Sequence, residues 1–139
     1  MHNYKLKTHR LNTIYNQPHF FILNRGLNSG KPLEHPCPNC FVCLCNNEEE
    51  KNSLYWILFG LWQGKSFHPY LVGSVILLIR IDDVKLLMNQ ALKKCNLSPH
   101  KFLKNIYAIR QIHEHALNIQ KQLDTIKQLK QAIMLDILK

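Results

Sequence analysis

The sequence contains no long apolar run, and this absence limits where the protein acts. Its two most apolar stretches, residues 54–62 and 71–81, are separated by a polar segment. Both are shorter than the roughly 20 residues that a membrane-spanning helix needs. The first ten residues, MHNYKLKTHR, lack the apolar core of a secretory signal. We therefore expect a cytoplasmic protein that does not insert into a membrane.

Acidic residues are also scarce. Nine Asp and Glu stand against 18 Lys and Arg, and the formal net charge is +9. No paired carboxylates and no Ser/His/Asp set are visible that would support catalysis. His113 and His115 are two residues apart in a predicted helix, so they lack the i, i+4 spacing of a zinc-protease helix. The sequence favours a protein that is not an enzyme.

A single domain is expected from the length of 139 residues, because domains commonly hold about 100–150 residues. Residues 1–47 are predicted to hold strands and a loop rich in Cys and Pro. Residues 48–97 are predicted to hold a core helix, a strand and a helix. Residues 98–139 read as one long basic helix.

The pattern of apolar residues predicts an α+β fold. A small β-sheet, built from strands at 19–23, 41–45 and 74–81, packs on an apolar, aromatic helix at 48–63. Within residues 1–18, Tyr4, Leu6, Leu11 and Ile14 are expected to line one side of a short edge strand. Asn46 or Asn47 is expected to cap that helix. Two C-terminal helices follow, the first starting at Asp82 or Asp83.

The last helix is expected to begin with Ser98 as N-cap and Pro99 in the first turn. Isoleucine recurs every seven residues at Ile112, Ile119, Ile126 and Ile133, which is a coiled-coil pattern. The companion heptad positions are Ile109, Ala116, Leu123, Lys130 and Ile137. This seam either packs within its own chain or joins copies of the chain into a homo-oligomer.

The segment 28–45 holds four of the five cysteines. Cys37 and Cys40 have the two-residue spacing of a zinc knuckle, in which both sulfurs reach one ion. His35 and His68 are the candidate further ligands, since no distant second cysteine pair closes the site. The alternative is that these are reduced, buried thiols. Alternation along 41–45 places Cys43 and Cys45 on one face of a strand, which leaves Cys37 and Cys40 as the more exposed pair.

Both ends of the chain are basic. Residues 1–47 carry five basic residues against one acidic residue, and residues 98–139 carry seven against three. Such clusters suit contacts to phosphates, although they are also typical of the solvated face of an ordinary helix. The candidate nucleic-acid-binding residues are Lys5, Lys7, Arg10, Lys101, Lys104, Lys127 and Lys130.

Several short motifs resemble a family of small uncharacterised proteins from Bacteroidetes that occur around mobile and conjugative elements. They are PHFFI at 18–22, NRG at 24–26, SGKPL at 29–33, PCPNCFV at 36–42, and the HP, GSVI and IRI segments between residues 68 and 81. The family is a domain of unknown function, so the resemblance implies no activity or cofactor. It implies that Cys37 and Cys40 belong to the family pattern more regularly than Cys43 and Cys45.

Two hypotheses follow. The first is a non-enzymatic accessory protein of a bacterial mobile element that binds nucleic acid or a protein partner through its basic surfaces. The second is a zinc-binding module centred on the knuckle formed by Cys37 and Cys40.

Overall fold

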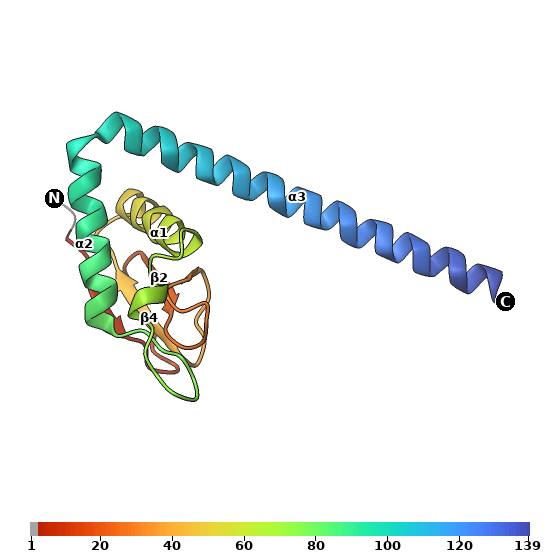
Figure 1. Cartoon of the computed structure of the whole chain (residues 1–139), viewed down its shortest axis with the longest axis horizontal. Helices are drawn as coiled ribbons and strands as arrows, with labels where there is room; N and C mark the ends of the chain where they lie inside the picture. Colours follow the sequence, from red (N-terminus) through yellow and green to blue (C-terminus); the bar gives the residue numbers. More distant parts are fainter. Residues whose placement is uncertain (1–2) are drawn as a thin grey trace. The chain divides into compact units, whose positions relative to one another are not determined.

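A computed structural model describes residues 3–139 and shows a small sheet followed by helices (Figure 1). The strands are β1 (Lys5–Thr8), β2 (His19–Leu23), β3 (Pro32–Leu33) and β4 (Cys40–Leu44). The helices are α1 (Glu48–Gln63), the short 3-10 helix η1 (His68–Tyr70), α2 (Ile81–Leu97) and α3 (Pro99–Ile137). The predicted α+β class, with a long last helix, is confirmed.

The four strands form one antiparallel sheet in the order β1-β4-β2-β3. β4 lies in the middle and pairs with β1 on one side and β2 on the other. The predicted pairing of the cysteine segment with residues 19–23 is therefore confirmed. The edge strand is confirmed around Leu6, but the prediction is wrong for Leu11 and Ile14, which lie beyond the end of β1 and are exposed. The two-residue strand β3 was not expected, because its proline lacks the backbone donor that a strand interior needs.

The sheet has two unequal faces. Phe20, Ile22 and Cys43 lie in the main core with residues of α1 and α2. The opposite face carries a smaller apolar cluster that contains Phe21, Cys40, Val42 and Leu44. We call this opposite face the outer face of the sheet. Helices α1 and α2 contribute no residue to its cluster.

Helix α1 forms as its local sequence predicts. The side chain of Asn47 accepts a hydrogen bond from the backbone N–H of Glu50, which satisfies a free donor in the first turn. Three glutamates in the first turn complement the positive end of the helix dipole. Leu54 and Leu58 are fully buried against the sheet, so the helix is a central element of the core.

The prediction of a strand over residues 74–81 is wrong. Val75 is 94% exposed and Ile76 is 57% exposed. The backbone of Val72 pairs with that of Leu78 in both directions, at 2.9 and 2.8 Å, which closes the residues between them into a loop. Gly73 adopts a positive φ of 119° at the start of that loop. The apolar composition of the segment predicted a strand, but its pairing with the residues after β2 is limited to an isolated bridge between Arg25 and Leu78.

Helix α2 begins at Ile81, earlier than predicted, with Arg80 as the N-cap. Asp82 and Asp83 therefore lie in its first turn, where they complement the dipole instead of capping it. Ser98 separates α2 from α3, which starts at Pro99 as expected. None of the described helices is long and apolar enough to cross a membrane.

The chain divides into two compact units, one ending at Ile106 and the other comprising Tyr107–Lys139. The second unit is the continuation of α3 and contains no other helix or strand. None of the described residues of α3 is buried.

Candidate functional site

The loop before β4 brings the two cysteines of the knuckle together. The Cys40 thiol donates a hydrogen bond to the carbonyl oxygen of Cys37 at 3.1 Å, and the Cys37 thiol donates to that of Asn39 at 3.4 Å. Cys37 is half-buried, but Cys40 is only 1% exposed. The expectation that both cysteines are exposed is therefore wrong for Cys40. Strand β4 begins at this residue, and its side chain joins Val42 in the apolar cluster of the outer face.

Cys43 and Cys45 point to the other face, as the alternation predicted, and both are fully buried in the main core. A hydrogen bond with the Cys45 side chain, together with burial, raises the pKa of the Cys43 thiol far above its ordinary value. Burial raises the pKa of Cys40 to about 11. Both thiols therefore stay protonated at neutral pH, a state in which they are poor nucleophiles and poor metal ligands.

No group of three or more His, Cys, Asp or Glu residues within 3–139 is arranged to hold a metal ion. His35 is exposed in the proline-rich loop, and His68 is exposed in η1. The structure thus places Cys37 and Cys40 close together, but within residues 3–139 it places no third metal ligand beside them. Zinc binding through Cys37, Cys40, His35 and His68 stays a prediction.

We expect Cys37 to be the first thiol to react with a chromogenic disulfide reagent at pH 8. Cys40, Cys43 and Cys45 are buried, and a pKa near 11 keeps Cys40 protonated at that pH. Burial also raises the pKa of Cys95, the other half-buried thiol. The pKa of Cys40 is higher in the folded protein than in the unfolded chain. The buried thiol of Cys40 therefore stabilises the fold below the pKa that it has in the unfolded chain, and this stabilisation is lost as the pH rises towards 11. The rate of absorbance change measures the reaction.

Cys37→Ser should remove the fast phase, whereas Cys95→Ser, a change in half-buried Cys95 on α2, should leave it intact. Rapid reaction of the three buried thiols in the native protein would contradict the packing of β4.

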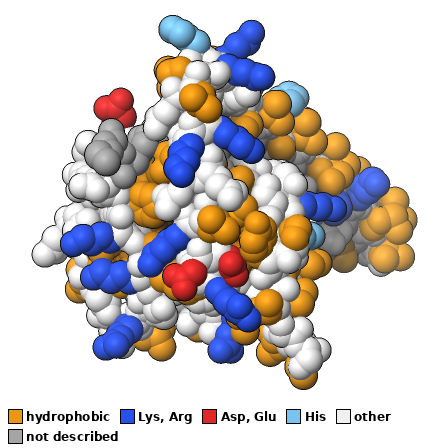
Figure 2. Space-filling view, turned by 60° about the vertical axis from the view of Figure 1, so that its left-hand side comes forward, with side chains coloured by type: hydrophobic (Ala, Val, Ile, Leu, Met, Phe, Trp, Pro, Cys, Tyr) orange, Lys and Arg blue, Asp and Glu red, His pale blue; other side chains and the backbone are white. Residues whose placement is uncertain are grey.

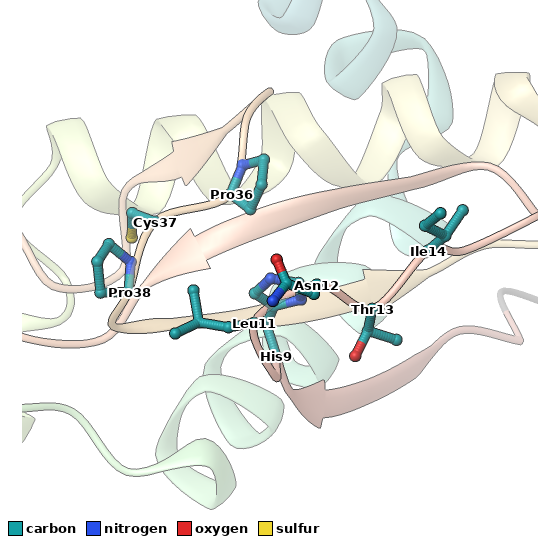
Figure 3. Close-up of a pocket in the computed structure, with 8 residues that line it drawn as sticks. All are labelled: His9, Leu11, Asn12, Thr13, Ile14, Pro36, Cys37 and Pro38. Atoms are coloured by element: carbon teal, nitrogen blue, oxygen red, sulfur yellow. The ribbon is translucent and has the colours of Figure 1, made fainter.

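A pocket of about 480 Å³ opens between the turn after β1 and the proline-rich loop. Figure 3 shows Cys37 and Pro38 at one end, near Leu11, and Ile14 at the other. Its remaining lining residues are His9, Asn12, Thr13 and Pro36. This volume is in the range of small-ligand sites, but the lining offers only one ionisable ring and one thiol.

The sequence groups His9 with the basic residues near the N-terminus, and the structure places its ring in a cluster of aromatic side chains. His9 is 9% exposed, and its Nδ1 lies 3.0 Å from the Tyr15 hydroxyl. His9, Tyr15 and His19 surround Phe21, with ring centroids 5.0 to 6.4 Å from it. The alternation of side chains along a strand indicates this placement, because Lys5, Lys7 and His9 stand two residues apart and so fall on the same face.

Lys5 and Lys7 lie on the outer face of the sheet. They pair with Leu44 and Val42 of β4, while Leu6 between them turns into the main core. Arg10 follows in the turn after β1 and is exposed, as are both lysines. The sheet thus places Lys5 and Lys7 on the face that carries the aromatic cluster of His9 and Tyr15, and Arg10 directly follows His9 in the chain.

The four predicted cations of α3 fall in separate places. Lys101 and Lys104 belong to the first unit, and Lys101 lines a hollow of about 270 Å³ with Lys94 of α2. The sequence reasoning gave Lys94 no binding role. Lys127 and Lys130 belong to the second unit and are exposed.

Basic side chains are widely spread over the face that Figure 2 shows, and acidic side chains are few on it. Two cations elsewhere are engaged: Lys31 lies 5.0 Å from the centre of the Trp62 ring, and Lys51 pairs with Glu48 at 3.5 Å. None of the seven predicted cations has an ion-pair partner in the part of the chain that the structure describes.

These features define a basic α+β protein whose helices α1 and α2 pack on one face of a small antiparallel sheet, and whose other face carries cations and aromatic rings. The chain belongs to DUF6943, a family of unknown function, whose sequence profile matches residues 6–136. The match confirms the expected membership of a family of unknown function and extends beyond the motifs at 18–81. Searches of curated proteins and of solved structures found no match.

Proposed function

We propose that the protein is a non-enzymatic accessory protein of a bacterial mobile element that binds the phosphate backbone of nucleic acid. The outer face of the sheet makes the principal contact, through Lys5, Lys7 and Arg10. The observation that carries this proposal is that Lys5 and Lys7, exposed cations for which residues 3–139 supply no ion-pair partner, share the outer face with the half-exposed rings of Tyr15 and His19. Exposed Arg10 follows shortly after them in the chain.

The physical argument starts from counterion release. A cation that is not neutralised within the protein displaces a condensed ion from nucleic acid, and this release drives binding at low salt. Lys5 and Lys7 stand two residues apart on one strand, roughly 7 Å along it, so they present two charges in line. Aromatic rings beside such charges are suited to stack on bases of a single strand.

We expect fluorescence anisotropy to show binding to random single-stranded and duplex DNA, with an affinity that falls steeply as salt is raised. The triple variant Lys5→Gln/Lys7→Gln/Arg10→Gln should weaken binding by at least tenfold. Its slope of log affinity against log salt should be shallower by about two units on single strands, because three phosphate contacts are removed.

A matched control removes the same charge at Lys65, Arg80 and Lys85, which lie on α2 and in the segments before it. This control should retain most of the affinity. Equal losses in both triple variants would mean that net charge alone attracts the DNA. Weak binding that does not change with salt would exclude nucleic acid and favour an acidic protein partner at the same surface.

A further inference from the structure

The second unit is a helix whose seam isoleucines are all exposed, as far as residues 3–139 show. Ile112, Ile119, Ile126 and Ile133 are 69%, 53%, 50% and 52% exposed. A helix of this length gains most of its stability in proteins from packing, and not from helix propensity alone. Four isoleucines left half-exposed or more at a strict interval of seven residues therefore indicate a missing neighbour.

The period of the pattern identifies that neighbour as another helix. A seven-residue repeat keeps one seam facing a partner helix along a shared axis, because the two helices wind around each other. From Ile109 to Ile137 the seam runs about 42 Å along the helix. A globular partner would not require so regular an interval.

The other helices of the chain do not supply this neighbour. Helices α1 and α2 have 16 and 17 residues, about half the 39 residues of α3. Their apolar residues, such as Leu58 of α1 and Leu87 of α2, are already buried in the core on the sheet. In the described chain, only α3 itself has a free apolar stripe of matching length and period.

The charges beside the seam favour self-association. If the isoleucines occupy one seam position, the flanking positions hold His113, His115, Gln120 and Gln122 in the first two heptads, and only Lys127 and Asp136, of opposite sign, bring a fixed charge in the following ones. The chain has a net charge of +9, yet copies that meet along the seam bring few like charges together apart from Lys130. We propose that a second copy of this chain binds along the seam of α3, through a coiled coil.

Lys130 provides a test in which a substitution should strengthen the association of two copies. Lys130 occupies the companion seam position between Leu123 and Ile137. A single lysine in a seam lowers the stability of a coiled coil while it fixes the register. Lys130→Leu is therefore expected to strengthen association, which a lysine on a solvated face would not do.

The experiment is sedimentation velocity with nuclease-treated full-length protein from 1 to 100 µM, so that bridging by nucleic acid is removed. We expect the mass to rise above the monomer value of 16.4 kDa as concentration increases. The double variant Ile119→Lys/Ile126→Lys should remain monomeric throughout, an affinity loss of at least 100-fold. Lys130→Leu should lower the dissociation constant by about tenfold.

The matched control is Asn118→Lys/Gln128→Lys, which adds the same charge to the same heptads away from the seam. It should associate as the natural chain does. Circular dichroism checks that each variant keeps its helices, and tryptophan fluorescence checks that the first unit stays folded. A natural chain that is monomeric at every concentration, or a seam variant that associates normally, would overturn the proposal. Neither result depends on whether the protein binds DNA.

Discussion

Replacement of Gly30 by alanine is expected to lower the free energy of unfolding by about 3 kcal/mol. Gly30 has a φ of +97°, which L-residues rarely adopt. A Cβ atom built at this position would also overlap the ring of Phe67. That ring is fully buried in the main core, so it has no space into which to move. The backbone strain at Gly30 and the steric overlap with Phe67 therefore both lower the stability of the alanine variant.

Gly26→Ala is the matched control. Gly26 has a similar φ of +90°, but nothing lies within 4 Å of its added Cβ atom. The change should therefore carry only the backbone strain, about 1 to 2 kcal/mol. Urea unfolding followed by the fluorescence of Trp56 and Trp62 measures both variants. Equal destabilisation by the two changes would show that Phe67 does not press on Gly30.

Loss of the Glu50 carboxylate is the second large effect. We expect Glu50→Ala to lower the free energy of unfolding by about 3 kcal/mol, because hydrogen bonds to a charged group are worth about 1.5–3 kcal/mol each. The carboxylate is 8% exposed and accepts from the backbone N–H groups of Asn3 and Asn46, both at 2.8 Å. Without it, these two donors lose their partner.

The neighbouring Glu49 provides the control. It is exposed in the same first turn of α1 and complements the helix dipole in the same way. Glu49→Ala should cost no more than about 0.5 kcal/mol. Urea unfolding separates the two variants, and similar losses in both would mean that the dipole, and not the paired carboxylate, stabilises the structure.

Glu50 also connects stability to the proposed function. Asn3 lies two residues before Lys5, and its N–H is held by the carboxylate of α1. We infer that this contact keeps β1 aligned on the sheet edge, where it presents Lys5 and Lys7. A folded Glu50→Ala protein should therefore also bind DNA more weakly than the Glu49→Ala protein, by a smaller factor than the triple charge variant.

Local signals explain most of the fold that could be predicted. Asn47 and the glutamates after it mark the start of α1, and Pro99 marks the start of α3, because capping and dipole effects depend only on nearby residues. The alternation of Cys43 with Val42 predicted their opposite faces correctly. It did so because the two-residue period of a strand does not depend on which strand pairs with it.

The errors arise where a distant part of the chain decides the outcome. The segment 74–81 has strand composition, yet its only pairings are isolated bridges from Leu78 to Val72 and to Arg25, which close a loop and do not extend into a strand. Cys40 follows prolines and looked exposed, yet it is buried because it is the first residue of β4. Neither the pairing of Leu78 nor that of β4 can be recognised from the amino acids nearby in the sequence.

The candidate site divides in the same way. The sequence by itself determined the surplus of cations, the proximity of Cys37 to Cys40 and the heptad repeat of α3, since each follows from composition or short spacing. Only the tertiary structure decided that Lys5 and Lys7 share the outer face with Tyr15. It also decided that the carboxylate of Glu50 reaches Asn3, 47 residues away. The physical reason is that contacts across a sheet depend on which strands pair, and pairing is chosen by the packing of the whole core.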